Sequence, residues 1–359
     1  MTSKRLDDSS AFEFETAATR VVFGRGSAAA NVEKEAARLG AQSIMLIAAS
    51  AESDLAHRLT EQVRDRIVEV FGSVKPHVPH SAAVAAQECA VRSQADLLIS
   101  IGGGSTTGTA KIIARETGIP ILAVPTTYAG SEMTPVWGMT TDGIKETGKD
   151  LRVQPRVVIY DPALLVSLPR DLAVASALNA TAHALEGLWV PASSPVSDAL
   201  AVDSVAQLTL GLRKLCTGHS QSEDQLLLGA YLAGVTFAAT GSGLHHKICH
   251  ALGGAFDLPH AATHAVILPH VLQFNSGSIA SKMTRLEAAL GTGEVIRELR
   301  TVWRSAGAPE TLAELGMTAE QLDEAIDLVA RKLPIDNPRP VSAADVGNIL
   351  RSAYEGGDA

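Results

Sequence analysis

Histidines are concentrated in one part of this 359-residue sequence. Eight of the eleven histidines fall within residues 183–270, and six of them within 245–270. His246 and His250 are four residues apart, and His260 follows a proline. Imidazoles at helical and turn spacing can hold a divalent metal, or can exchange protons and hydrogen bonds with a bound substrate. Any one of these histidines fits an ordinary core or surface role better, but the cluster as a whole predicts a functional site.

Polar residues elsewhere in this half of the chain can contribute to the same site. Asn179, His183 and Glu186 are spaced i, i+4 and i+7, so a helix would place them on one face. Lys247 is a cation inside the histidine segment that can bind a carboxylate, although a solvated surface lysine explains it equally well. The other histidines of the segment are expected beside the site or on helix sides: His245, His264 and His270.

A glycine-rich turn lies in the first half of the chain, within LLISIGGGSTTGTAKIIA. The order is a buried strand, a loop and a helix. Gly102, Gly103 and Gly104 permit close backbone approach, and Ser105 or Thr106 would cap the helix, whose first amides can hold a phosphate. Because the segment matches neither GxGxxG nor the lysine-bearing phosphate loop, a simple turn remains the alternative.

A second donor-rich loop, VPTTYAGSEMT, also follows a predicted strand. It offers the hydroxyl groups of Thr126, Thr127 and Ser131 beside Gly130. Open parallel sheets bind their ligands at the carboxyl ends of the strands, where both loops would lie. Ordinary turns use the same residues, but the two loops together predict a dinucleotide site.

The predicted elements divide the chain into two parts. Short apolar runs predict strands at 43–48, 97–101, 119–124 and 157–160, separated by amphipathic segments such as 51–70 and 82–93. This alternation indicates a parallel sheet covered by helices. From residue 162 onward the periodicity is helical throughout, with helix-start signals at Ser194, Thr318 and Ser342. We therefore expect an α/β dinucleotide-binding domain over 1–161 and an all-α domain over 162–359.

Composition limits the classes of partner. The chain has 30 Lys and Arg against 39 Asp and Glu, a formal net charge of −9, which argues against nucleic acid. The N-terminus is polar, and no run reaches the ~18 apolar residues of a membrane span. Cys89, Cys216 and Cys249 are far apart in sequence, as expected for a reducing compartment. We expect a cytoplasmic protein with no membrane partner.

The chain resembles the iron-containing alcohol dehydrogenase superfamily from about residue 14 to its end. The motifs that carry the resemblance are GGGSTTGTAK, the PTT loop, VVIYDP, AHALEG and HxxxH…PHxxxHAVILPHVLQFN. Within the superfamily, the segments PTTYAGSEMTPVWGMT, KETGKDLRVQPRVVIYDP and GLHHKICHALGG are similar to the maleylacetate reductase branch. The resemblance implies the dehydroquinate synthase-like fold of the iron-type dehydrogenases, a cleft between the two domains and a homodimer.

The resemblance also raises the question of a metal. It places the superfamily's ligand positions on Asn179, His183, His246 and His260, but the usual Asp is Asn179 here. A neutral amide holds a dication less well than a carboxylate, so we expect no required metal. Two further departures are Gly108, in place of an Asp in the glycine motif, and a PTT loop that is one residue shorter.

The resemblance implies a nicotinamide cofactor, and we expect NADH. The second strand ends in Ala48, Ala49 and Ser50, where many NAD enzymes carry an acid against the ribose, so NADPH stays open as an alternative. Lys145, in the hairpin after the PTT loop, is expected on the nicotinamide side. The full set of predicted cofactor contacts is Gly103, Gly104, Ser105, Thr126, Thr127, Ser131 and Lys145.

The activity implied by the branch is reduction of the carbon–carbon double bond of maleylacetate, a small anionic dicarboxylate, to 3-oxoadipate in the degradation of aromatic compounds. The alternatives are a metal-dependent alcohol or aldehyde dehydrogenase acting on a carbonyl, and a nucleotide-binding protein without catalysis. An enolate formed in the reduction needs donors and a proton. The residues expected to supply them are His246, His250, Lys247, Tyr128 and His183.

Overall fold

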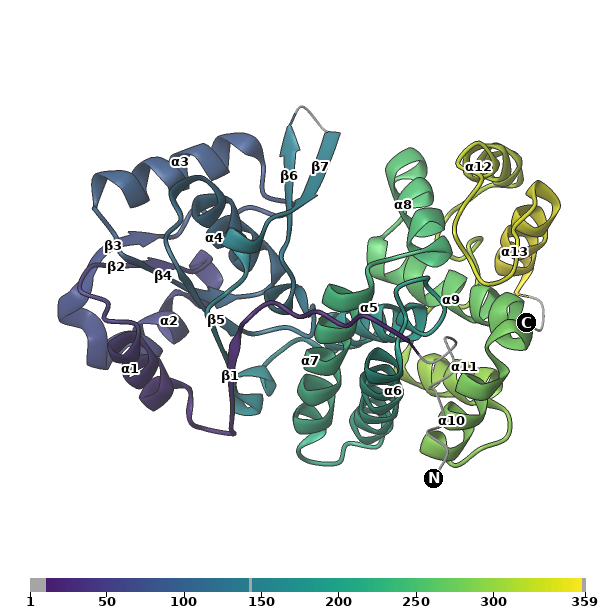
Figure 1. Cartoon of the computed structure of the whole chain (residues 1–359), viewed down its shortest axis with the longest axis horizontal. Helices are drawn as coiled ribbons and strands as arrows, with labels where there is room; N and C mark the ends of the chain where they lie inside the picture. Colours follow the sequence, from purple (N-terminus) through teal and green to yellow (C-terminus); the bar gives the residue numbers. More distant parts are fainter. Residues whose placement is uncertain (1–10, 142–143, 357–359) are drawn as a thin grey trace, which may run out of the picture.

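The computed structural model describes residues 11–141 and 144–356, which form an α/β part and a helical part lying side by side (Figure 1). The α/β part contains a six-stranded sheet in the order β1-β8-β5-β4-β2-β3, and all its pairs are parallel. Its strands are β1 (Arg20–Phe23), β2 (Ile44–Ile47), β3 (Ile67–Phe71), β4 (Leu97–Gly102), β5 (Ile121–Pro125) and β8 (Val157–Tyr160).

The central strands are apolar because helices cover both faces of the sheet. Every residue of β2, β4, β5 and β8 is buried. On one face the sheet packs against α1 (Ala28–Arg38) and α2 (Ser53–Thr60), and on the other against α3 (His80–Arg92) and α4 (Gly104–Thr117). Uninterrupted apolar runs are typical of parallel strands buried on two sides. The sequence predicted these four strands for that reason.

The segment predicted as one amphipathic helix over 51–70 is not continuous. It begins with the 3₁₀ turn η2 (Ser50–Glu52), continues as α2, passes through the 3₁₀ turn η3 (Glu61–Arg66) and ends as the edge strand β3. The expectation was wrong for the last part because IVEVF is rich in β-branched residues and alternates between exposed and buried positions, as half-buried strands do. Strand β1 was also missed.

A two-stranded antiparallel hairpin, β6 (Val136–Thr141) and β7 (Ile144–Lys149), projects from the α/β part beside the helical part (Figure 1). It follows the loop after β5 and packs against α4. The chain then returns to the sheet through β8. Asp161, which follows β8, accepts hydrogen bonds from the amides of Gly26 at 2.7 Å and Ala28 at 2.9 Å, so it ties the end of the sheet to the start of α1.

After the 3₁₀ turn η6 (Pro162–Leu165), the described chain is helical. The helices are α5 (Arg170–Gly187), α6 (Pro195–Cys216), α7 (Ser222–Thr240), α8 (Leu244–Phe256), α9 (His260–Ser276), α10 (Ala280–Leu290), α11 (Val295–Ala306), α12 (Ala319–Ala330) and α13 (Ala343–Glu355). Capping boxes form at Thr318 and Ser342, as the sequence predicted, and the serine cap predicted for the helix at Ser194 is also a capping box, with Ser197. The predicted fold class, an α/β dinucleotide-binding part followed by a helical part, is confirmed.

The helical part is built around buried helices. Helix α7 packs against both α5 and α6, and α9 packs against α5 and α8. Within the described residues no single helix has the length and hydropathy of a membrane span, and α7 and α8 pass that test only as a pair bent by 100°.

Candidate active site

The glycine loop joins β4 to α4 with its backbone close to the following helix. Gly102 has φ +152°, and a Cβ there would lie 2.4 Å from the Thr106 hydroxyl. Helix α4 starts at Gly104 with Gly103 as its N-cap, and no side chain caps it. The expected cap by Ser105 or Thr106 is therefore wrong, because both residues lie inside the first turn. The first amides of α4 keep their capacity to bind an anion, as a pyrophosphate site requires.

The PTT loop lies directly against the glycine loop. The Thr126 amide donates to the Gly102 carbonyl at 3.2 Å, and a Cβ on Gly103 would lie 3.0 Å from Thr127 Cγ2. Ser131 begins the 3₁₀ turn η4 (Ser131–Met133) at the end of the loop. The structure thus brings together the glycines and threonines that the sequence predicted as cofactor contacts. Glycine backbone, helix amides and hydroxyls at one strand-end crevice fit a dinucleotide.

A buried lysine anchors this loop to the hairpin. Lys111 Nζ donates to the carbonyl oxygens of Ser131 at 2.6 Å, Thr134 at 2.8 Å and Val136 at 2.8 Å. Burial lowers the pKa of Lys111 to about 7, and the nearby Glu132 carboxylate opposes that shift. One ammonium group therefore fixes both the end of the PTT loop and the start of β6. Lys111 was not among the site residues expected from the sequence.

Helix α7 connects the cofactor loops to the histidines. Gly130, with φ +72°, packs on this helix so closely that a Cβ on Gly234 would lie 2.7 Å from the Gly130 carbonyl oxygen. Phe237, one turn further along α7, packs on His183 and His246 with ring centroids 4.5 and 5.5 Å apart. The two regions that the sequence identified separately are therefore neighbours along a single helix.

The histidines expected to act together form a chain of adjacent rings. His183, from α5, stacks on His246, from α8, with centroids 5.2 Å apart and planes inclined by 16°. His250 lies 5.9 Å from His246, and His260 stacks on His250 at 5.9 Å. His246 is buried, whereas His250 and His260 are exposed. The structure thus gathers these four predicted site residues.

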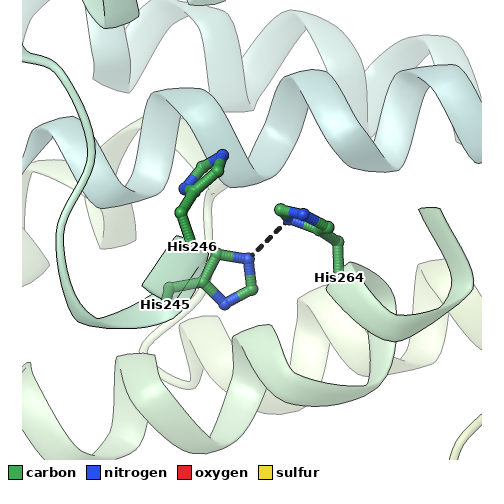
Figure 2. A group of neighbouring side chains, drawn as sticks. All are labelled: His245, His246 and His264. Carbon is green, nitrogen blue, oxygen red and sulfur yellow. Dashed lines mark hydrogen bonds between the residues drawn. The ribbon is translucent and has the colours of Figure 1, made fainter. Parts of the chain in front are cut away.

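Two histidines expected beside the cluster belong to it. His245 Nε2 and His264 Nδ1 are hydrogen-bonded at 2.9 Å, and the ring of His264 lies 4.8 Å from that of His246. Figure 2 shows His245 and His246 on one helix and His264 reaching toward them from the next. The sequence missed this because it reveals spacing along a helix but not which faces of α8 and α9 meet. His270 lies apart, near Arg300.

Glu186 orients His246. This fully buried carboxylate contacts His246 Nδ1 and accepts the backbone amides of His245 at 2.7 Å and His246 at 3.3 Å. Burial alone would raise the pKa of Glu186, but the charge of His246 and the hydrogen bonds outweigh it and lower the pKa to about 2. A carboxylate at Nδ1 leaves Nε2 as the ring atom available to a ligand. The sequence signal was Glu186 sharing a helix face with His183.

Several buried polar atoms around His246 have no hydrogen-bond partner in the described structure. They are Asn179 Oδ1, His183 Nδ1, His246 Nε2 and His264 Nε2. Burial lowers the pKa of His245 to about 3, and burial together with neighbouring histidines lowers the pKa of His183 and His264 well below 6.5. Buried polar groups are nearly always paired in folded proteins, so this group of atoms marks a place where a ligand completes the hydrogen bonding.

Three of the predicted site residues, Tyr128, Lys247 and Lys145, lie outside the group of histidine rings. Tyr128 is buried, and burial together with Glu223, at the start of α7, raises its pKa. The histidine rings pack at Phe237, toward the other end of that helix, and the expected role of Tyr128 beside them stays a prediction. Lys247 is exposed on α8. Lys145 lies on β7, but its side chain is outside the described part of the structure.

The comparisons with known proteins identify the family. The model of the iron-containing alcohol dehydrogenase family matches residues 18–162, and the model of that family's C-terminal domain matches residues 173–354. The chain belongs to the iron-containing alcohol dehydrogenase family.

Within this family, the chain is similar to maleylacetate reductases. It is 43% identical to the maleylacetate reductase of Burkholderia cepacia over 96% of this chain and 98% of that protein. A solved maleylacetate reductase from Agrobacterium tumefaciens superposes with a TM-score of 0.91 at 35% identity, covering 97% and 99% of the two chains. An iron-containing alcohol dehydrogenase from Corynebacterium glutamicum superposes with a TM-score of 0.92 at 43% identity, covering 97% and 98%.

The metal implied by the family name would meet an altered set of residues at its expected place. Asn179 stands where the family has a carboxylate, and its Nδ2 lies 3.5 Å from His183 Nε2. Among the described residues, the one group of three candidate ligands with donor atoms within 4.8 Å is His245, His246 and His264. Two of those rings are already hydrogen-bonded to each other. The nearby carboxylate, Glu186, is engaged by His246 and the backbone, so a dication held by the described histidines would have imidazole ligands without this carboxylate.

Proposed function

We propose that this chain reduces the carbon–carbon double bond of maleylacetate to 3-oxoadipate with NADH, a step in the degradation of aromatic compounds. The observation that carries the proposal is a pair of buried nitrogens without hydrogen-bond partners in the described structure, His183 Nδ1 and His246 Nε2. Their rings pack against α7 one turn from the place where the PTT loop packs on the same helix. The 43% identity to a maleylacetate reductase over nearly the full length supports the choice of substrate.

The substrate defines what the site must do. Maleylacetate carries an enone between two carboxylates, and the nicotinamide supplies a hydride to the carbon β to the ketone. Negative charge then develops on the ketone oxygen as an enolate. His246 donates to that oxygen through Nε2, while Glu186, held at Nδ1, balances the charge of the protonated ring. A proton delivered to the adjacent carbon completes the reduction and typically contributes about 10²–10⁴ in rate.

The residues around His246 have different roles in this reaction. His183 stacks on His246 and shields it from water. His250 is exposed at the edge of the cluster, where it can exchange protons with solvent, and Lys247, also exposed, is suited to attract a substrate carboxylate. Tyr128, a buried residue of the PTT loop, is kept as a candidate hydrogen-bond donor to the substrate.

The cofactor is held by residues of the two strand-end loops. Gly103, Gly104 and Ser105 offer helix N-terminal amides to the pyrophosphate, while Thr126, Thr127 and Ser131 offer hydroxyl groups. We further propose that the reaction requires no metal, because the ligand position of the family's carboxylate is the amide Asn179. The imidazoles then take over the stabilisation of negative charge that a Lewis acid would provide.

We also propose a cytoplasmic homodimer without nucleic-acid or membrane partners. The net charge of −9 and the three cysteines, none in a disulfide, are consistent with this proposal. Strand β1 is an edge of the sheet and therefore has one side for pairing with a second copy. Light scattering of the purified chain tests the dimer, and a monomer at micromolar concentration would refute it.

The test of the activity is an NADH-oxidation assay with maleylacetate, run with and without exhaustive chelation. We expect equal rates in both arms and 3-oxoadipate as the product. Activity that disappears on chelation and returns with iron or zinc would refute the metal-free mechanism. Turnover of simple aldehydes but not of maleylacetate would instead favour a carbonyl-reducing dehydrogenase.

His246→Ala and His250→Ala are expected to lower turnover, and wild-type rates in both variants would contradict the roles given to these histidines.

A further inference from the structure

A carboxylate lies where the two cofactor loops meet the end of β2. Glu52 closes the turn η2, directly after that strand. The Thr126 hydroxyl donates to Glu52 Oε1 at 2.9 Å, and Glu52 Oε2 lies 3.0 Å from the position that a Cβ on Gly102 would take. Glu52 therefore touches the carboxyl ends of both β4 and β5, although it is 50 or more residues away from them in sequence.

This position is the topological switch point of the sheet. Strand β2 pairs with β3 on one side and with β4 on the other, so the chain leaves β2 in one direction and then returns to its opposite side. Doubly wound sheets bind nucleotides in the crevice that such a reversal opens at the strand ends. Glu52 lies at this reversal, next to the glycine loop that would hold the pyrophosphate.

The charge of Glu52 has no ion-pair partner in the described part of the chain. Within residues 11–141 and 144–356, no lysine, arginine or histidine forms an ion pair with it. Glu52 is half-buried, and its Oε1 accepts the hydrogen bond from the Thr126 hydroxyl. Oε2 can therefore accept from a hydroxyl of a ligand, and among the described residues no cation paired with Glu52 stands there to receive a phosphate.

We propose that Glu52 binds the hydroxyls of the adenosine ribose and thereby selects NADH against NADPH; this inference rests on the proposed function and specifies its cofactor. The strand end itself, Ala48 to Ser50, carries no acid, but Glu52 supplies one two residues later. A carboxylate accepts hydrogen bonds from neighbouring 2′- and 3′-hydroxyls. The 2′-phosphate of NADPH would instead bring further negative charge against Glu52, at a cost that water at the crevice only partly screens.

The experiment measures binding of each nucleotide without substrate, by the fluorescence of the reduced nicotinamide. We expect the wild-type chain to bind NADH at least tenfold more tightly than NADPH. Glu52→Gln, which keeps the shape and removes the charge, is expected to reduce that ratio at least tenfold, chiefly through tighter NADPH binding. Glu61→Gln is the matched control, since Glu61 is exposed and paired with Arg64 in the next turn of chain. It should leave the ratio unchanged.

Thermal melting and a salt series complete the test of Glu52. If Glu52→Gln melts well below the wild type, a salt series on the wild type decides, because screening of the repulsion should lower the preference for NADH. A ratio unchanged by both the substitution and the salt overturns the role of Glu52. Equal wild-type affinity for both nucleotides also overturns it, while the proposed reduction stands. If the wild type binds neither nucleotide, the proposed function itself fails.

Discussion

At the scale of single residues, the sequence identified most histidines of the cluster but not which side chains they contact. His183, His246, His250 and His260 were predicted from spacing and resemblance, and the structure gathers them. His264 could not be predicted as a member because it enters from α9, and its bond to His245 depends on how two helices pack. Tyr128 is buried in the PTT loop, and its role in the reaction stays a prediction.

Glu186 illustrates what a buried partner adds to a histidine. We expect Glu186→Gln to lower kcat about 10²-fold or more while KM for maleylacetate changes less than threefold. The neutral amide still accepts the backbone amides of His245 and His246, but it cannot balance a proton on the His246 ring. Steady-state kinetics at pH 7 separates the two parameters.

The control for that substitution is Glu324→Gln, which makes the same chemical change at an exposed position of α12. It should leave both parameters at wild-type values. If Glu186→Gln raises KM and leaves kcat unchanged, Glu186 contributes to binding alone, and the assignment of charge balance to it is wrong.

At the scale of elements, the strands of the inner sheet and the capped helix starts were predictable because local patterns determine them. Continuous apolar runs marked β2, β4, β5 and β8. A serine followed by a proline marked the start of α6, and the spacing of a capping box marked the starts of α12 and α13. Strand β3 was not predictable in the same way, because as an edge strand it buries one face and its alternation is short. The contact of the PTT loop with α7 also depends on tertiary packing.

That loop-to-helix contact yields a prediction at this scale. Gly234→Ala would place a Cβ 2.7 Å from the Gly130 carbonyl oxygen, which is backbone and cannot rotate away. We expect the PTT loop to be displaced from α7, a destabilisation of about 1–3 kcal/mol, and a severalfold higher KM for NADH. Thermal melting and cofactor kinetics measure the two effects.

Gly254→Ala is the matched control, because Gly254 is also a helical glycine but nothing lies within 4 Å of a Cβ there. Alanine should be neutral at this position or stabilise the helix by up to about 1 kcal/mol. Equal melting temperatures and equal KM values in the two variants would show that the close approach of Gly130 to Gly234 does not position the loop.

At the scale of the whole molecule, the resemblance and the alternation of elements were sufficient to predict an α/β part followed by a helical part. They could not predict that the PTT loop and the histidine rings contact successive turns of α7. A consequence of this architecture is a core rich in histidines. Since burial lowers the pKa of His183, His245, His264 and His270, protonation of these rings favours the unfolded chain.

The resulting acid sensitivity can be tested at His270, which is buried away from the cluster. Burial, with a smaller effect of Arg300, lowers the pKa of His270 from 6.5 to about 4. Between these values the unfolded chain binds a proton that the folded chain does not, so the free energy of unfolding falls as the pH falls below 6.5. This group contributes about 1.4 kcal/mol per pH unit within that window.

His270→Gln should make the pH dependence of the free energy of unfolding shallower by that amount, as measured by urea unfolding at pH 7, 6 and 5. His219→Gln, at an exposed position, should leave it unchanged, and identical slopes in the two variants would contradict the assignment.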